Sequence, residues 1–463
     1  MGVIMKHFYI KLLAFSFCVS LCFIVFTSCG TSKTGNKTES QTNTKSESNK
    51  GVTSFPLPGG QEEADIYVEA IPDISDDFIR GMDTSSVLAL ENSGITYYNF
   101  EGKEQDVFMT LAQSGVNYIR LRVWNDPYDE KGNGYGGGNN DVPTAIKLGK
   151  RATKYGMKVY IDFHYSDFWA DPKRQLTPKA WEGMNIDEKS DALYDFTKES
   201  LIKMLDAGVD VEMVQIGNEI NNGMAGEVTL PKVMKLLQSG SKAVREISKK
   251  YDKDIQIAVH YTNIEDSAGI DKIASRLSDY GLEYDIFAIS YYPFWHGTME
   301  NMQAVVENIR EKYGKKAVIA ETSYCYTTED GDGFGNSFDG TNGLVDGYPA
   351  TVQGQTSMIR DICAAANEAG ALGIFYWEGT WIPVGKVTED NSPIWEKYGS
   401  GWASSYAADY DPTDAGLYYG GCSWDNQAMF DFDGHPLPSL NVFKFLKYGT
   451  KTSSSKNDFT DTN

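Results

Sequence analysis

The chain has 463 residues and a formal net charge of −22, because 64 acidic side chains outnumber 42 basic ones. This balance argues against nucleic acid and anionic membrane surfaces as partners, since both are bound through clustered Lys and Arg. The 28 Tyr and 9 Trp residues instead favour a neutral ligand held by flat contacts, and the length allows one large domain or two average ones.

Residues 1–29 are expected to be a lipoprotein signal peptide. A basic flank precedes the apolar run Leu12–Phe26, and the sequence TSCG follows at residues 27–30. This sequence resembles the cleavage point of bacterial lipoproteins. We therefore expect a secreted bacterial lipoprotein that is tethered to the membrane through a lipid on Cys29, in the cell envelope at the cell surface, and in the outer membrane. A plain signal peptide and a single membrane anchor are the alternatives.

The rest of the chain divides by composition. Residues 30–75 are expected to form a low-complexity tether and an N-terminal extension, because Thr31–Asn49 is almost entirely polar and cannot bury a core. Residues 51–76 are acidic and contain proline, and we expect them to pack loosely or to stay disordered. Residues 76–449 form one large domain, and the polar residues 450–463 form a disordered tail.

Cysteine usage argues against a disulfide framework. Outside the expected signal peptide and Cys29, the chain has only Cys325, Cys363 and Cys422, an odd number without CxxC spacing. One pair is compatible with this count, and the sequence does not choose it.

The large domain alternates short apolar runs with longer amphipathic stretches. This alternation indicates a parallel α/β sheet, and eight such units predict a (β/α)8 TIM barrel with long βα loops. A doubly wound open sheet is the alternative, weakened because no glycine-rich nucleotide fingerprint follows the first run. The expected strands are Phe78–Met82, Val116–Val123, Val159–Phe163, Val211–Gly217, Ile255–Val259, Ile286–Ser290, Ala317–Ala320 and Ala371–Tyr376, and the clearest helices are Val142–Tyr155, Lys189–Ala207, Leu230–Lys250, Met299–Tyr313 and Val352–Ala369.

Polar or aromatic residues stand at the end of every expected strand. In such a barrel the carboxyl ends of the strands build the active site. Single polar residues at loop starts are common, but eight strand ends in succession are harder to explain in that way. The residues are Asp83, Arg122, Trp124, His164, Asp167, Asn218, Glu219, His260, Tyr291, Tyr292, Glu321, Trp377 and Glu378.

Two carboxylates stand out among these residues. Glu219 in QIGNE and Glu321 in VIAET each come directly after a buried strand. Paired carboxylates on fixed strands are the apparatus of glycoside hydrolysis, in which one protonates the leaving oxygen and the other attacks the sugar or activates water. The structural alternative is a salt bridge with Arg122.

The motifs around these glutamates resemble one family. The chain is similar to the arabinogalactan endo-β-1,4-galactanases of glycoside hydrolase family 53, within the clan of retaining (β/α)8 glycosidases. The resemblance runs from about Phe78 to Tyr448. It is carried by GMDTSS (81–86), GVNYIRLRVWNDP (115–127), GYGGGNND (134–141), DFHYSDFWADP (162–172), VQIGNEI (214–220), SYYPFWHGT (290–298), ETSY (321–324) and FYWEGTWIPVG (375–385).

The resemblance implies an endo-acting retaining enzyme that cleaves β-1,4-galactosidic bonds in pectic galactan or type I arabinogalactan and releases galacto-oligosaccharides. Glu219 would be the acid/base, with a raised pKa, and Glu321 the nucleophile. We expect Arg122 to hold Glu321 ionised and Asn218 to donate to the sugar 2-hydroxyl. The other expected substrate-binding residues, around the cleaved bond, are Asp83, Asp167, His164, His260 and Tyr291. For the last three, the alternative is that they support the residues that touch the substrate.

Aromatic side chains are expected to line the rest of the groove, because the C–H faces of sugar rings pack on Trp and Tyr. The long loop 401–421 after the eighth strand suits an extended groove and internal cleavage of a polymer. Packing in the barrel or loop core is the alternative and should apply to at least one of these residues. The candidates are Trp124, Trp169, Trp295, Trp377 and Trp402.

The glycine-rich sequence EDGDGFGN offers oxygen ligands at alternating positions, as Ca²⁺ prefers. A solvated acidic turn is the alternative. The resemblance implies a structural calcium that joins the loops after strands seven and eight, and Phe334 stands where the familiar bacterial pattern has His. The expected ligands are Asp330, Asp332, the backbone of Phe334, Asn336, the carbonyl of Cys422, and Asp425. We expect no organic cofactor and no zinc cluster.

Three other functions are alternatives. A sister activity of the same barrel, such as mannanase, xylanase or cellulase, is disfavoured by the long motifs. A surface glycan-binding lipoprotein without catalysis would need neither Glu219 nor Glu321. A periplasmic solute receptor would need two domains and a hinge. We expect a monomer, although the sequence carries no direct signal for the oligomeric state.

Overall fold

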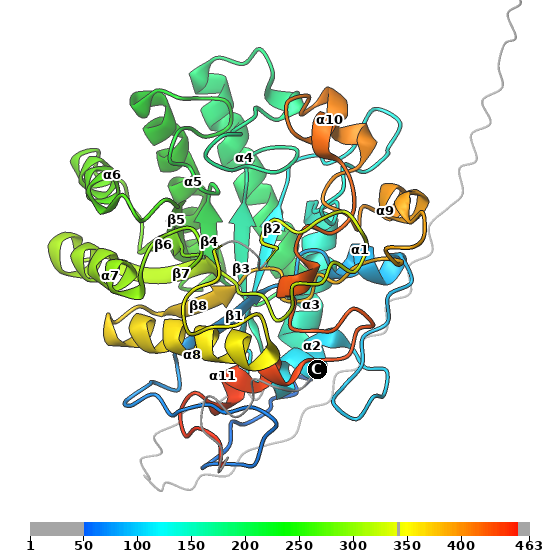
Figure 1. Ribbon diagram of the computed structural model, residues 1–463. Coiled ribbons are helices and arrows are strands. Elements are labelled where there is room, and N and C mark those ends of the chain that lie inside the picture. Colours follow the sequence, from blue (N-terminus) through cyan, green and yellow to red (C-terminus); the bar gives the residue numbers. More distant parts are fainter. Residues whose placement is uncertain (1–50, 340–342, 452–463) are drawn as a thin grey trace, which may run out of the picture. The chain divides into compact units, whose positions relative to one another are not determined.

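The computed structural model describes residues 51–339 and 343–451. In this part of the chain eight parallel strands form a closed barrel in which each strand pairs with the next and β8 pairs with β1 (Figure 1). The predicted (β/α)8 fold is thereby confirmed. The strands are β1 (Ile79–Asp83), β2 (Tyr118–Val123), β3 (Lys158–Phe163), β4 (Val211–Ile216), β5 (Gln256–Tyr261), β6 (Ile286–Ser290), β7 (Lys316–Thr322) and β8 (Gly373–Tyr376).

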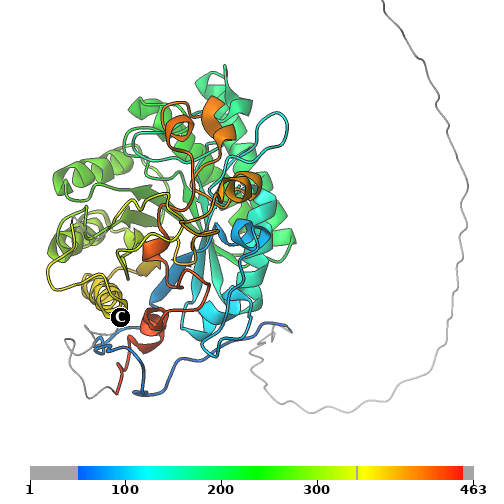
Figure 2. The same ribbon diagram turned by 45° about the vertical axis from the view of Figure 1, so that its right-hand side comes forward.

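Helices surround the barrel and connect successive strands (Figures 1 and 2). Their starts carry the expected local signals: α4 begins at a capping box in which the Asn185 side chain accepts from the backbone of Glu188 and the Glu188 side chain accepts from the backbone of Asn185. The helices are α1 (Val87–Asn92), α2 (Val107–Gln113), α3 (Val142–Lys154), α4 (Ile186–Asp206), α5 (Leu230–Tyr251), α6 (Ser267–Asp279), α7 (Met299–Tyr313), α8 (Val352–Glu368), α9 (Ser392–Tyr398), α10 (Ala415–Tyr418) and α11 (Val442–Phe445).

Three strands end later than the sequence indicated, and for the first, β1, the difference is the single residue Asp83. The seventh was expected to end at Ala320, but β7 continues to Thr322, so that Glu321 lies within it. Likewise β5 continues to Tyr261 and includes His260. The register between β6 and β7 also shifts next to Ser290, which pairs with Glu321. Such an irregularity re-aims side chains at the end of a strand.

The barrel interior is apolar toward the amino-terminal ends of the strands and charged toward their carboxyl ends, where the barrel opens. Gly81 is required in the apolar part, because a Cβ at this position would lie 2.2 Å from the Phe375 ring. Above this layer lie buried polar side chains such as Arg120 and Asp162. The apolar layer contains Ile79, Tyr160, Met213, Ala258, Ile286, Ala288, Val318, Ala320 and Phe375.

Part of the expected N-terminal extension belongs to the folded domain. Ile66, Val68 and Ile71 are buried in the main core. The backbone of Val68 donates to the Thr450 hydroxyl at 2.9 Å, and that of Ile71 donates to the Leu446 carbonyl. The expected signal peptide, Cys29 and the tether up to residue 50 lie outside the described residues, as does the tail from residue 452. Among the described residues, no helix is long and apolar enough to cross a membrane.

Candidate active site

A cavity of about 820 Å³ opens at the carboxyl ends of the strands, where a (β/α)8 enzyme carries its active site. It brings together Glu219, Glu321 and most of the other residues that the sequence singled out. Its lining includes Asp83, Arg120, Arg122, His164, Trp169, Asn218, Glu219, Tyr292, Trp295, Glu321, Trp377, Trp402 and Trp424.

Glu219 follows β4 in a left-handed backbone conformation, with φ at 46°. This conformation is costly for a residue with a side chain and occurs mainly where function needs it. The Ser290 hydroxyl donates to Glu219 Oε1 at 2.7 Å. Burial of the carboxyl group, together with the charge of Glu321, raises the pKa of Glu219 to about 8. Glu219 is therefore held as a carboxylic acid near neutral pH.

Glu321 lies on β7 with two donors on its carboxylate. Arg120 Nη1 is 2.9 Å from Glu321 Oε1, and the Tyr292 hydroxyl donates to Glu321 Oε2 at 3.0 Å. Burial raises the pKa of Glu321, while the charge of Arg120 and the Tyr292 hydrogen bond act in the opposite direction. The two glutamates thus have different surroundings, because Glu321 has a cation beside it and Glu219 has a second carboxylate.

The prediction that Arg122 holds Glu321 is wrong. The residue beside Glu321 is Arg120, and Arg122 forms an ion pair with Glu378 instead. The two arginines are two residues apart on β2, so both point into the barrel. Arg122 lies one step nearer the mouth, where β8 ends and Glu378 follows.

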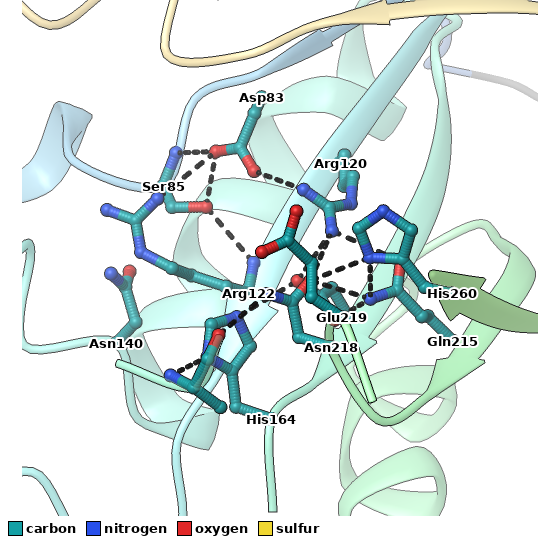
Figure 3. Close-up of polar contacts among 12 residues, drawn as sticks. Asp83, Ser85, Arg120, Arg122, Asn140, His164, Gln215, Asn218, Glu219 and His260 are labelled. Atoms are coloured by element: carbon teal, nitrogen blue, oxygen red, sulfur yellow. Dashed lines mark hydrogen bonds and ion pairs between the residues drawn. The ribbon is translucent and has the colours of Figure 1, made fainter. Parts of the chain in front are cut away.

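Arg120 connects the strands beneath the cavity (Figure 3). Its guanidinium group lies 2.9 Å from Asp162 and 3.4 Å from Asp83, and it donates to Asn218 Oδ1 at 3.0 Å. The side chain is 1% exposed. These contacts fix the orientation of both the charge and the amide next to Glu219.

Asn218 lines the cavity next to Glu219. Its Oδ1 is occupied by Arg120 and by Gln215, whose Nε2 donates at 2.9 Å (Figure 3). Its Nδ2 donates one hydrogen to the Ala170 carbonyl at 2.9 Å. His260 lies behind Asn218 at 2.9 Å and is fully buried, outside the lining of the cavity. His260 therefore supports Asn218 from behind.

His164 has a defined tautomer. Its Nδ1 accepts from Trp124 Nε1 and from the backbone of Ala170, each at 3.1 Å, so its Nε2 carries the hydrogen and donates to Asp162 at 3.1 Å. Trp124 is fully buried and is not among the described residues that line the cavity. Trp124 thus orients His164 and is no stacking surface for a sugar.

At the end of β6 the tyrosine that faces the cavity is not the predicted Tyr291 but the residue after it, Tyr292. Tyr291 points away, is 1% exposed and donates to the Gly297 carbonyl. Tyr292 faces the cavity and contacts Glu321. The inward-facing residues alternate through Ile286, Ala288 and Ser290 to Tyr292, so the period of two along the strand places Tyr292 and not Tyr291 toward the cavity.

Aromatic rings form the walls of the cavity. Trp169 and Trp402 stack with their centroids 4.5 Å apart and their planes at 10°. Trp377 meets Trp424 edge to face at 4.7 Å, and Trp295 is 50% exposed at the rim. Trp424 was missed because it comes from a distant loop, and its buried indole N–H has no hydrogen-bond partner among the described residues.

Two acidic residues have structural partners. Asp167 accepts from the backbone of Asp126 and of Lys179 and lies outside the lining of the cavity in the described chain. Glu378, at φ 49° and fully buried, accepts from the Ser86 hydroxyl at 2.6 Å. Burial raises the pKa of Glu378 to about 7. Neither residue touches the cavity, although the sequence placed Asp167 in the binding site.

A second acidic cluster joins the loops after β7 and β8. One carboxylate oxygen from each of Asp330, Asp332 and Asp425 lies within 4.8 Å of the others. Asp332 also accepts from the backbone of Cys422 at 2.7 Å. Asp425 Oδ1 and Asn336 Oδ1 are buried and accept no hydrogen bond from the described residues. Burial raises the pKa of Asp425 to about 7, so this group of oxygens has the chemistry of a cation site.

Phe334 takes part in this second cluster through its backbone and its ring. Its backbone N–H donates to Asp332, and its ring packs on Gly420, where a Cβ would lie 2.0 Å away. The ring thus fills space between the two loops without offering a ligand atom from its side chain.

Comparisons with known proteins identify the family of the chain. The model of glycosyl hydrolase family 53 matches residues 79–443. An endo-beta-1,4-galactanase of Bacillus subtilis is 55% identical over 83% of this chain and 90% of its own length. An arabinogalactan endo-beta-1,4-galactanase of Cellvibrio japonicus is 32% identical over 79% and 93% of the two chains. Among solved structures, the catalytic domain of a family 53 enzyme from Ignisphaera aggregans is 40% identical, with a TM-score of 0.73, and covers 83% of this chain and 99% of its own. The chain therefore belongs to glycosyl hydrolase family 53 and is a glycoside hydrolase.

Proposed function

We propose that this protein is an endo-acting, retaining β-1,4-galactanase. The observation that carries the proposal is the unequal pair of glutamates in one cavity, with Glu219 at a pKa of about 8 and Glu321 beside Arg120. A retaining glycosidase needs one carboxylic acid and one carboxylate on opposite sides of the bond it cleaves.

The reaction would proceed in two steps. Glu219 donates its proton to the glycosidic oxygen while Glu321 attacks the anomeric carbon, which releases the leaving sugar and forms a covalent glycosyl-enzyme. Glu219, now ionised, removes a proton from water as the water attacks the same carbon and frees Glu321. Asn218 would hold the 2-hydroxyl, and its position in the lining of the cavity beside Glu219 supports this role.

The proposed substrate is the β-1,4-galactan of pectin, or type I arabinogalactan, cut into galacto-oligosaccharides. Support comes from the Bacillus subtilis and Cellvibrio japonicus relatives, which carry the names of galactanases. A neutral polysaccharide also suits a protein of net charge −22 and a cavity walled by Trp169, Trp377, Trp402 and Trp424.

We further propose a structural calcium ion in the acidic cluster and no organic cofactor. Asp330, Asp332 and Asp425 would hold the ion, with Asn336 and the backbone carbonyls of Phe334 and Cys422. The two buried oxygens that accept no hydrogen bond, Asp425 Oδ1 and Asn336 Oδ1, support this fit. The ion would tie the loops after β7 and β8 together, and no step of the reaction passes through it.

The proposed location is the outside of a bacterial cell envelope, in the outer membrane, with a monomeric enzyme attached through a lipid on Cys29. This proposal rests on the basic, apolar and cysteine-containing pattern of residues 1–30. A polymer as large as galactan is accessible to an enzyme displayed in that way.

The test is digestion of unbranched pectic β-1,4-galactan, with product sizes followed over time for the native protein and for Glu321→Ala. Short oligosaccharides from the native protein alone would support both the substrate and the nucleophile. Mannan, xylan and cellulose in parallel reactions distinguish the sister activities. Binding of galactan without any product from the native protein would instead indicate a glycan-capture lipoprotein.

A further inference from the structure

Residues 399–421, here called the arm, follow α9 and include α10, which lies to one side of the barrel (Figures 1 and 2). The backbone of Gly137 donates to the Gly401 carbonyl at 2.7 Å, and Trp169 Nε1 donates to the Trp402 carbonyl at 3.0 Å. The arm thus contacts the loops that follow β2 and β3.

Tyr410 attaches the arm to neighbouring loops through uncharged contacts, which are one fastening of the arm. Its hydroxyl accepts from the backbone of Asp167 and donates to the Thr177 carbonyl, each at 3.0 Å. Its ring stacks on Tyr135 with the centroids 5.8 Å apart. The hydroxyl contacts hold the arm to the β3–α4 loop, and the stacking holds it to Tyr135 of the loop between β2 and α3.

A second fastening consists of charged groups. Arg174, on the β3–α4 loop, forms an ion pair with Asp414 of the arm and lies 3.6 Å from Asp411 of the arm. On its own loop it donates to Asp171 at 2.8 Å. The side chains of Arg174 and Asp411 are only 15% and 1% exposed.

These charges depend on one another. Arg174 Nη1 and Asp411 Oδ2 are buried, and neither makes a hydrogen bond within the described part of the chain. An ion pair on an open surface contributes little, but removing one partner from a buried group leaves an uncompensated charge and is strongly unfavourable. The charged fastening is therefore expected to stay closed in the free enzyme.

The charged fastening forms one end of the cavity. Asp171, Lys173 and Arg174 from the β3–α4 loop line the cavity together with Thr413 and Asp414 from the arm. The same loop braces the segment of the proposed acid/base, because Gln175 Nε2 donates to the Asn218 carbonyl at 2.8 Å. A polysaccharide that extends in this direction meets a wall in which two loops are joined.

We propose that Arg174, Asp411 and Asp414 form an ionic latch that closes one end of the groove and limits how many sugar units bind there. The latch rests on the proposed function, since its ligand is a neutral β-linked galactan chain. It makes Arg174 and Asp414 determinants of product length, separate from the glutamates that cleave the bond.

The test compares Arg174→Gln, Asp414→Asn, the double variant and Arg174→Lys in the full-length protein. Early products from β-1,4-galactan are sized. Arg174→Gln is expected to shift the most abundant product by at least one sugar unit and to broaden the distribution. The double variant should change it no more than Arg174→Gln alone, because both remove one latch. Arg174→Lys should shift it less than Arg174→Gln, because the charge is kept while the fork geometry of the guanidinium group is lost. Arg245→Gln, which removes an ion pair with Asp285 on the outer surface, is the matched control.

Unchanged product lengths in Arg174→Gln, or additive shifts in the double variant, would overturn the latch even if the rate falls. A readout without turnover separates this result from a failure of the galactanase proposal. Galacto-oligosaccharides of increasing length are titrated into Glu321→Ala with and without Arg174→Gln. The latch predicts that affinity stops rising at a greater chain length when Arg174 is replaced. Equal limits in the two proteins would also overturn it. Thermal unfolding of each variant identifies any that has lost its fold.

Discussion

Arg120 Nη1 lies 2.9 Å from Glu321 Oε1, and the same guanidinium group lies 2.9 Å from Asp162. One buried cation therefore serves the proposed nucleophile and a carboxylate that also binds His164. Since charges in a buried site interact more strongly than in water, the orientation of this single side chain sets the electrostatics of the reaction.

Replacing Arg120 by Lys should lower kcat by about 100-fold, because an ammonium group cannot serve Glu321, Asp162 and Asn218 in the fixed geometry of a guanidinium group. Steady-state kinetics on galactan would measure the loss. Arg122→Lys is the matched comparison on the same strand, and it should affect kcat less because its partner is Glu378. Equal losses in the two variants would contradict the assignment of Arg120.

Tyr292→Phe should move the acidic limb of the kcat/KM profile to higher pH. The Tyr292 hydroxyl lowers the pKa of Glu321, so its removal raises that pKa. Since the reaction needs Glu321 ionised, activity at low pH is lost first. The pH dependence of kcat/KM is the measurement, and Tyr291→Phe, which changes a hydroxyl away from the cavity, should leave the limb where it is.

Ser290→Ala should move the alkaline limb to higher pH. The Ser290 hydroxyl donates to Glu219 and lowers its pKa, which is about 8 in the native protein. Glu219 must be protonated to act as the acid, so activity is lost as the pH rises through this pKa, and the variant should keep activity to a higher pH. A limb that moves to lower pH would show that Ser290 stabilises the protonated form instead.

Removal of calcium should lower the melting temperature by roughly 5 °C, because an ion bound only to the folded state stabilises it by mass action. Differential scanning calorimetry with and without EGTA would measure the shift. Asp425→Asn should remove the response, since this residue offers a buried oxygen without a hydrogen bond. Identical melting curves for the native protein in both buffers would argue for a solvated acidic turn.

The sequence predicted the barrel and both glutamates because their signals are local. An apolar run that leads into a carboxylate indicates the carboxyl end of a strand: Glu219 follows β4, and Glu321 is the last residue but one of β7. Two other assignments depended on which alternate residue of a strand faces its partner in the cavity. Arg120 and Arg122 share one face of β2, so their residue types do not show which of them reaches Glu321. Tyr292 faces the cavity because it continues the alternation of Ile286, Ala288 and Ser290, and this period of two is present in the sequence.

Other parts of the site come from long-range packing. Trp124 and His260 are polar or aromatic at strand ends, as expected, yet both are buried behind residues that face the cavity. Trp424 lies in a loop without strand or helix periodicity and still reaches the cavity. The burial and orientation of these side chains depend on which loops pack against each other. No local motif in a single sequence records that packing.

The left-handed backbone of Glu219 connects the proposed activity with the stability of the fold. At φ 46° a side chain costs of order 1–3 kcal/mol, and the charge of Glu321 adds repulsion once Glu219 ionises. A Glu219→Gly protein would be inactive, yet it should unfold at a higher temperature than Glu219→Ala, because only glycine relieves the backbone. The fold therefore carries backbone strain at a position where the proposed chemistry needs a carboxyl group, and a substitution that relieves this strain also removes the acid/base.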